Sequence, residues 1–238
     1  MMKKNLAVLC VLGCFTSAAW AGNTIDPSQF TGANAQANFK IFSEDLGAAL
    51  SYKAVTPPAP LGITGFDLGL EITSTKMRNL DIATGGSNNL PVPKLHVYKG
   101  LPMNFDIGAV YSAVPNSNIR FYGGEVRYAV LEGGIASPAV GVRGAITKLT
   151  GVNQLSLSTK SLDVSVSKGF VMFTPYAGAG LVWTDSTPDA SLGLTKESFQ
   201  QTKVFLGGNL NLGLTNLALE VDKTGSANSV SAKVGFRF

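Results

Sequence analysis

The sequence predicts an all-β protein, a closed antiparallel transmembrane β-barrel of about ten strands with a short N-terminal helix. Apolar and polar residues alternate with a period of two over many segments, and no apolar run after residue 21 approaches the roughly 20 residues of a membrane helix. The last strand shows the alternation most clearly, because one face carries Val230, Ala232, Val234, Phe236 and Phe238. Its other face is polar. Only a closed barrel satisfies the backbone of such strands in lipid.

Residues 1–21 have the three parts of a secretory signal peptide. Lys3 and Lys4 precede an apolar run over residues 6–15, and the small-residue site Ala19-Trp20-Ala21 follows. The apolar run is too short to span a bilayer as a helix, so we expect cleavage after Ala21. The alternative is lipidation at Cys14, because residues 11–14 resemble a lipobox.

The composition excludes several classes of function. Both cysteines, Cys10 and Cys14, lie in the predicted signal, so a mature chain has neither disulfides nor thiolate metal sites. No spacing of His, Asp or Glu indicates a metal or cofactor site. The mature chain would have 238 − 21 = 217 residues, with 19 − 2 = 17 basic and 15 acidic side chains. A net charge of +2 offers no case for nucleic-acid binding.

The predicted barrel occupies residues 62–238. The alternating segments cover about residues 66–73, 95–98, 103–112, 122–130, 140–146, 162–166, 170–183, 203–212, 217–222 and 230–238. Short turns are predicted at residues 99–102, 132–134, 168–169 and 213–216, and mostly longer loops at 78–89, 114–118, 149–154, 185–197 and 224–228. Outer-membrane barrels keep short turns in the periplasm and longer loops outside. This rule places the C-terminus at the periplasmic end.

Residues 22–61 form a separate N-terminal segment. Apolar residues recur at spacings of three and four from Phe39 to Leu50, with Ser43 to Asp45 on the other side, which predicts an amphipathic helix of about 15 residues. The proline-rich stretch 57–60 then ends regular structure. The helix could plug the lumen or rest against the periplasmic rim. Alternatively, Leu46 to Lys53 is a strand, and the barrel has about twelve strands.

Charged side chains occupy the strand faces that would line the lumen. They are seven acids and five bases: Asp67, Glu71, Asp106, Glu125, Arg127, Arg143, Asp163, Lys203, Glu220, Asp222, Lys233 and Arg237. In one interpretation they pair with one another and fill a narrow barrel, since buried charges persist only when they are paired. In the other, some of them line a small aqueous path whose selectivity is set by charge.

The signal peptide and the ending Val234-Gly235-Phe236-Arg237-Phe238 together resemble those of small Gram-negative outer-membrane β-barrel proteins of the OmpA, OmpX and OmpW kind. The resemblance implies an outer-membrane location after export through the periplasm. It implies contact with outer-membrane lipid and lipopolysaccharide. It also implies that Phe236 and Phe238 belong to the signal read by the barrel-assembly machinery during insertion.

We expect an integral outer-membrane barrel with a structural role or a narrow passive pore, and not an enzyme, because no catalytic motif is present. One alternative is a lipid- or peptide-directed barrel enzyme that uses His96, with Ser112 and Asp106 as conceivable partners. Another is an adhesin or binding protein that acts through loops 78–89 and 185–197. The sequence identifies neither a permeant solute nor a surface ligand.

Overall fold

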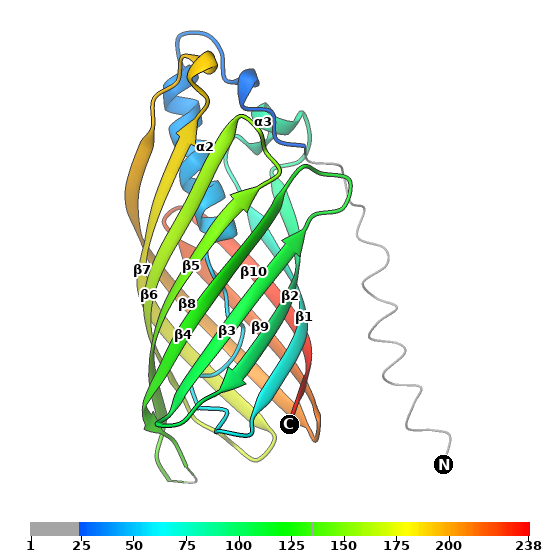
Figure 1. The fold of residues 1–238 in the computed structure, drawn as a ribbon, viewed down its shortest axis with the longest axis vertical. Helices are drawn as coiled ribbons and strands as arrows, with labels where there is room; N and C mark the ends of the chain where they lie inside the picture. The colour runs from blue at the N-terminus through cyan, green and yellow to red at the C-terminus, as the bar shows by residue number, and fades with distance from the viewer. Residues whose placement is uncertain (1–23, 135) are drawn as a thin grey trace, which may run out of the picture.

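The computed structural model describes residues 24–134 and 136–238, so the predicted signal peptide and Cys14 lie outside the described residues. In this part of the chain ten antiparallel strands form one closed barrel (Figure 1). The strands are β1 Phe66–Lys76, β2 Asn89–Gly100, β3 Phe105–Ala113, β4 Arg120–Glu132, β5 Ala139–Thr150, β6 Leu155–Ser167, β7 Phe173–Pro188, β8 Glu197–Leu212, β9 Thr215–Thr224 and β10 Ala227–Arg237. Each strand pairs with its sequence neighbours, and β1 pairs with β10 to close the wall. The predicted fold class is confirmed.

The two ends of the barrel differ in their connections. The end that carries loops 77–88, 114–119, 151–154, 189–196 and 225–226 is called the loop end, and the opposite end, where Phe238 lies, the turn end. The longest connection is at the loop end and contains helix α3, Leu80–Thr84. The connection predicted at 224–228 is present but shorter, because β9 and β10 are joined only by Gly225 and Ser226. Gly225 has a φ of +57° there, which favours glycine.

Most strands are longer than predicted, and the reason is a change of polarity along them. In β6 the turn-end half points Leu162 and Val164 outward and Asp163 inward, as predicted. The loop-end half reverses this pattern: Ser156 points outward, and Leu157 is fully buried. Where the apolar and polar faces exchange within one strand, the sequence pattern indicates that the strand ends although it continues.

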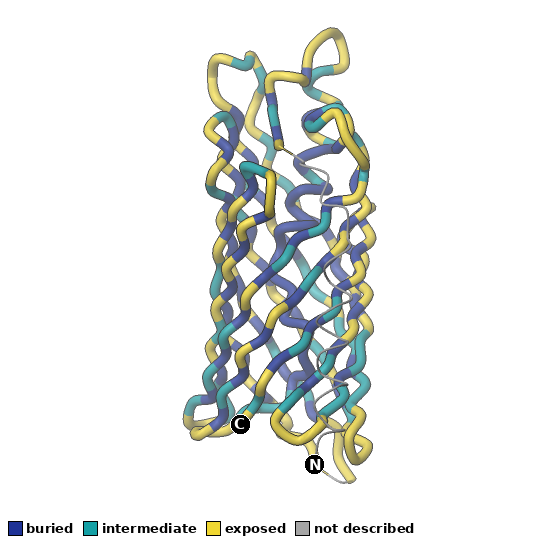
Figure 2. The backbone as a smooth tube through the Cα atoms, turned by 90° about the vertical axis from the view of Figure 1, so that its right-hand side faces the viewer, coloured by how far each residue is buried: buried dark blue, intermediate teal, exposed yellow. Residues whose placement is uncertain are grey.

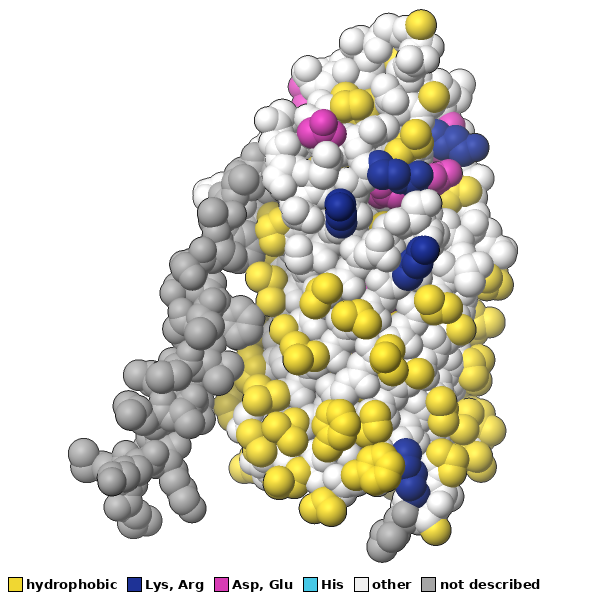
Figure 3. Space-filling model, turned by 180° about the vertical axis from the view of Figure 1, so that it is seen from behind, with side chains coloured by type: hydrophobic (Ala, Val, Ile, Leu, Met, Phe, Trp, Pro, Cys, Tyr) yellow, Lys and Arg dark blue, Asp and Glu magenta, His cyan; other side chains and the backbone are white. Residues whose placement is uncertain are grey.

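The inversion divides the outer surface into two zones. Exposed apolar side chains form an apolar belt toward the turn end, and it includes Leu70, Val126, Ile146, Val164 and Leu219. Figure 3 shows hydrophobic side chains gathered over the lower part of one face and most of the charged groups nearer the top. The belt is the surface that contacts hydrocarbon in a transmembrane barrel, and the loop-end zone extends beyond it.

The part of the N-terminal segment from residue 35 onward lies largely inside the barrel. After a 3-10 turn at Pro27–Gln29, helix α2 spans Ala35–Leu50 and descends into the lumen from the loop end (Figures 1 and 2). A second 3-10 turn lies at Ala190–Leu192 in the β7–β8 loop. The predicted helix is confirmed, and the alternative strand at Leu46 to Lys53 is wrong, because Leu46 lies inside the helix. None of the described helices has the length and apolarity needed to cross a membrane.

Residues 51–61, here called the strap, continue from α2 through the lumen to the turn end, where β1 begins (Figure 1). Pro57, Pro58 and Pro60 prevent the strap from forming a helix or joining a sheet. Residues 51–58 are all buried. Irregular backbone at membrane depth is tolerated only where protein or a polar cavity surrounds it, and the barrel wall surrounds the strap.

Candidate functional site

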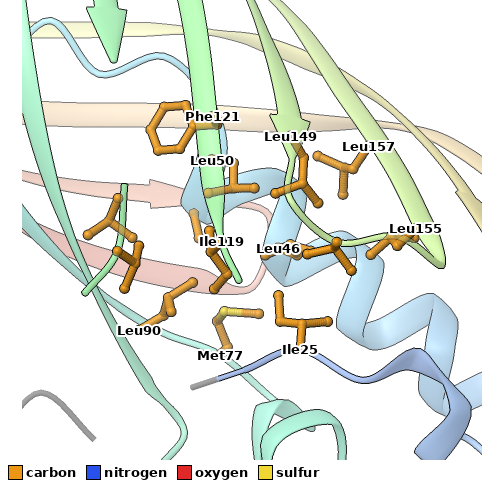
Figure 4. Close-up of a cluster of buried hydrophobic side chains, with 14 of the residues drawn as sticks. Ile25, Leu46, Leu50, Met77, Leu90, Ile119, Phe121, Leu149, Leu155 and Leu157 are labelled. Carbon is orange, nitrogen blue, oxygen red and sulfur yellow. The ribbon is translucent and has the colours of Figure 1, made fainter. Parts of the chain in front are cut away.

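The loop-end part of the lumen is packed like the core of a soluble protein. Figure 4 shows Leu46 and Leu50 of α2 among inward-pointing side chains of the wall. Several strands and the loop residue Ile119 contribute fully or almost fully buried apolar residues; those of the strands include Leu90, Val92, Phe121, Leu149, Leu155 and Leu157. Because the outward face is polar at this height, the inward face must be the apolar one. This apolar cluster closes the loop end around α2.

Polar contacts fix the orientation of α2 within the apolar cluster. Ser43 Oγ lies 2.9 Å from Ser186 Oγ of β7. Asp45 accepts the backbone N–H of Arg78 and forms an ion pair with its guanidinium, with Nη2 at 2.8 Å from Oδ1. Gly47 allows close approach to the wall, because a Cβ there would lie 2.5 Å from Thr184 Oγ1. Ser43 and Asp45 were expected on an open polar side of the helix, but both are buried because the wall encloses it.

The strap is held in the membrane zone by a buried ion pair. Lys53 Nζ lies 2.8 Å from Asp222 Oδ1 of β9, and both side chains are at most 1% exposed. Next to it, Lys203 of β8 donates to the carbonyl oxygen of Tyr52 at 2.9 Å. Charge-assisted hydrogen bonds of this length are the stronger kind.

Two arginines hold the lower part of the strap. Arg127 of β4 donates through Nη1 to the carbonyl oxygen of Pro57 at 3.0 Å and pairs with Asp106. Arg237 of β10 donates to Thr56 Oγ1 at 2.9 Å and pairs with Asp67.

These contacts also satisfy the strap backbone. The Tyr98 hydroxyl donates to the Ala54 carbonyl oxygen at 3.1 Å, and the Leu61 N–H donates to Asp106 Oδ1 at 3.0 Å. A buried carbonyl without a partner costs free energy comparable to that of a lost hydrogen bond. The wall therefore provides donors and an acceptor that a neighbouring strand would otherwise supply. We call this set of contacts the strap clamp; its residues are Lys53, Tyr98, Asp106, Arg127, Lys203, Asp222 and Arg237.

All twelve predicted lumenal charges point into the barrel. Eleven of them are at most 7% exposed, and the Arg237 side chain is 26% exposed. Most have an opposite charge at ion-pair distance: Arg143 with Asp163, Lys203 with Asp163, and Lys233 with Asp67. Glu220 instead accepts from the Tyr176 hydroxyl at 3.0 Å. Glu125 is held least, because its nearest cation atom is Arg143 Nε at 3.8 Å and neither of its oxygens has a hydrogen-bond partner.

Two cations that complete this network are missing from the predicted set. Lys94 of β2 is buried against Glu71, with Nζ 2.6 Å from Oε1, and Lys53 comes from the strap. With these two, seven bases face the seven predicted acids in the described lumen. The alternation of β2 placed Lys94 beside His96 on one face, so its inward position could have been inferred. Nothing in the strand pattern could have found Lys53, because it lies outside the strands.

His96 has a different set of partners from the one predicted. Its Nε2 lies 2.6 Å from Glu71 Oε2, its Nδ1 lies 2.9 Å from the Tyr98 hydroxyl, and its side chain is fully buried. Ser112 donates instead to the Pro93 carbonyl oxygen, and Asp106 pairs with Arg127. The structure therefore does not bring Ser112 or Asp106 to His96 as the enzyme hypothesis requires.

Both loops of the adhesin hypothesis contact α2. Arg78 pairs with Asp45, and Gln36 of α2 accepts the Thr195 N–H at 2.8 Å and donates to Glu197. Within residues 24–134 and 136–238, no three His, Cys, Asp or Glu side chains gather as a metal site would require. The charged side chains of the lumen therefore bind the N-terminal segment or one another.

No protein-family model matches the sequence, and no curated protein sequence matches it. Among solved structures, the chain is similar to the N-terminal β-barrel domain of Pseudomonas aeruginosa OprF, with 14% identity and a TM-score of 0.38 over 72% of this chain and 97% of that one. It is similar to the KdgM porin, with 10% identity and a TM-score of 0.37 over 74% and 99%. It is also similar to Neisserial surface protein A, with 13% identity and a TM-score of 0.30 over 72% and 95%.

Proposed function

We propose that this protein is an integral outer-membrane β-barrel whose lumen is closed by its own N-terminal segment, and that it serves the envelope as a sealed structural barrel. The observation that supports this most is the strap clamp. Cations of three wall strands, Arg127, Lys203 and Arg237, donate to the strap, and Lys53 of the strap pairs with Asp222 of a fourth. An open pore would leave these charges to water; here they bind the segment that fills the lumen.

The proposed orientation places the loop end outside the cell and the turn end in the periplasm. The apolar belt would then contact outer-membrane lipid, and lipopolysaccharide would surround the loop-end zone. Phe236 and Phe238, both exposed on the outer face at the turn end, would be available to the barrel-assembly machinery during insertion. Aromatic residues at a membrane boundary are consistent with this placement.

Planar-bilayer recordings of the refolded protein test the closed lumen. We expect wild type to show no conductance above leak. Lys53→Met removes the cation of the buried pair and should produce opening events. A steady wild-type conductance would contradict the proposal.

A disulfide lock provides the control. Ser43→Cys combined with Ser186→Cys replaces two hydroxyls whose oxygens are 2.9 Å apart, so a disulfide joining α2 to β7 is feasible. In the Lys53→Met background, the oxidised lock should suppress the openings and reduction should restore them. If openings persist with the lock closed, the current does not depend on displacement of the N-terminal segment.

A further inference from the structure

The barrel wall contains a seam between β2 and β3 on the side toward the loop end. β2 pairs with β3 only from Gly100 to Leu95, where Leu95 stands opposite Tyr111. β2 itself continues to Asn89, and over residues 89–94 it pairs with β1 alone. The other neighbouring strand pairs are joined over ten or more residue pairs, except β3 with β4, which has nine along the whole of β3. At the seam, the pairing of β2 with β3 therefore stops in the middle of β2, while β2 itself continues.

The direction of the backbone groups of β2 explains where pairing stops. The Gly100 N–H donates to Gly65, on the β1 side, and the Leu101 N–H donates to Phe105, on the β3 side. Because successive residues of a strand point their N–H and C=O groups to opposite neighbours, the odd-numbered residues of β2 face β3.

Pro91 and Pro93 are both odd-numbered, so their missing N–H groups are on the side toward β3. Pro93 would stand opposite the last residue of β3, and Pro91 lies beyond that end. The next rung after Leu95 would place Pro93 opposite Ala113, and proline has no N–H to offer. Ser112 Oγ instead donates to the Pro93 carbonyl oxygen at 2.6 Å. The contact with β1 is unaffected, because the even-numbered residues make it.

A cavity of about 400 Å³ opens at this seam. Its apolar lining comes mainly from side chains of the apolar belt, among them Leu70, Leu95, Tyr111 and Ala113 with Pro93. The residues Leu70, Leu95 and Tyr111 are 59%, 41% and 53% exposed, so the cavity is open to the surrounding medium. Its lining is therefore continuous with the surface that contacts hydrocarbon.

Volume alone does not set this cavity apart. A groove of about 450 Å³ between β8, β9 and β10 is lined by Val204, Leu206 and Val230 among others, but the strands beneath it are fully paired. The seam differs because two strands separate where it lies. The seam also lies beside Tyr111, at the loop-end side of the belt. At that depth we expect the upper segments of the acyl chains and not the chain ends of lipids in the same leaflet.

We propose that the β2–β3 seam binds one acyl chain of a membrane lipid. A peptide strand is the other occupant that an open strand edge attracts. Such a strand would need the N–H donors that Pro91 and Pro93 lack, whereas a hydrocarbon chain needs only the apolar lining. The proposal depends on the barrel being embedded in lipid, and it is independent of whether the lumen is closed.

Photo-crosslinking of the full chain tests the proposal. The protein is reconstituted in phospholipid vesicles that contain phosphatidylethanolamine with a diazirine in the upper part of one acyl chain, and labelled peptides are mapped by mass spectrometry. An acyl chain seated between the two parted strands contacts protein atoms on more than one side and so gains dispersion contacts that a chain on fully paired strands lacks. We therefore expect residues 93–95 and 111–113 to be labelled several-fold more than the β8–β10 groove.

Two variants of the seam should remove the excess labelling. Pro93→Thr supplies the N–H donor opposite Ala113 and lets the ladder continue to the end of β3, and Ala113→Phe fills the cavity. The matched control is Leu219→Phe, which enlarges an exposed belt residue on the fully paired β9 and should leave the excess unchanged. Heat-modifiable migration on a gel reports whether each variant folds. Uniform labelling of the belt in wild type, or an excess that survives Ala113→Phe, would overturn the proposal.

Discussion

The two halves of the lumen hold the same N-terminal segment by opposite means. At the loop end, α2 is packed in an apolar cluster around Leu46 and Leu50, whereas the strap is held by ion pairs and charge-assisted hydrogen bonds. The outer surface explains the contrast, because the wall faces water in the first case and hydrocarbon in the second. Successive strand residues point to opposite faces, so the charged residues that alternate with the lipid-facing ones point inward, where they hold the strap.

The largest expected effect is on the strap side. Lys53→Met leaves Asp222 buried without its cation, which should lower the free energy of unfolding by about 3–5 kcal/mol. Urea titration of the refolded protein in detergent micelles measures it. Lys76→Met, at an exposed position of β1, is the matched control and should change little.

The double variant Lys53→Met with Asp222→Leu sharpens the result. Replacing a buried ion pair by apolar side chains is often neutral, so most of the lost stability should return. A Lys53→Met protein that is as stable as wild type would show that the pair does not hold the strap.

A somewhat smaller effect is expected in the apolar cluster. Leu46→Ala removes a fully buried side chain and should cost about 2–5 kcal/mol, according to how far the cluster can collapse. The same urea titration applies, with the exposed Lys40→Ala of α2 as control. No second substitution is expected to restore the lost stability here, because Leu46→Ala leaves no charged residue without its partner. A loss below that of the control would mean that α2 is not packed as described.

The smallest effect is expected at Glu125. Its carboxylate has no hydrogen-bond partner and lies 3.8 Å from Arg143, so Glu125→Gln should change the free energy of unfolding by less than about 1 kcal/mol. Asp163→Asn is the comparison, because Asp163 is bonded to both Arg143 and Lys203 and should lose about 3–5 kcal/mol. Equal losses in the two variants would contradict the difference in pairing.

The sequence predicted the barrel, its strand number and the helix, because each depends on a local repeat. The period-two pattern of residues 230–237, for example, matches the alternation of burial over that part of β10. It failed where the environment of the wall changes: in β6 the inward face passes from Leu157 to Asp163, and the prediction therefore began the strand at residue 162 instead of Leu155. A search for strands whose alternation inverts once would have recovered these loop-end halves.

The lumenal site was predictable only in part. The twelve charges followed from strand parity, but parity says nothing about partners that come from outside the sheet. Lys53 lies in an irregular stretch, and its approach to Asp222 spans 169 positions of the chain. The partner of His96 was likewise missed, because Glu71 lies on β1, whereas the predicted partners Ser112 and Asp106 lie on β3.

The route of the strap also constrains how the molecule can assemble. β1 begins at the turn end, yet the residues that precede it in the chain reach the opposite end through the middle of the barrel. If the barrel closed first, α2, a helix with two phenylalanines, would have to pass the closely packed side chains of the lumen. We therefore expect the ladder between β1 and β10 to form around an N-terminal segment that is already in place.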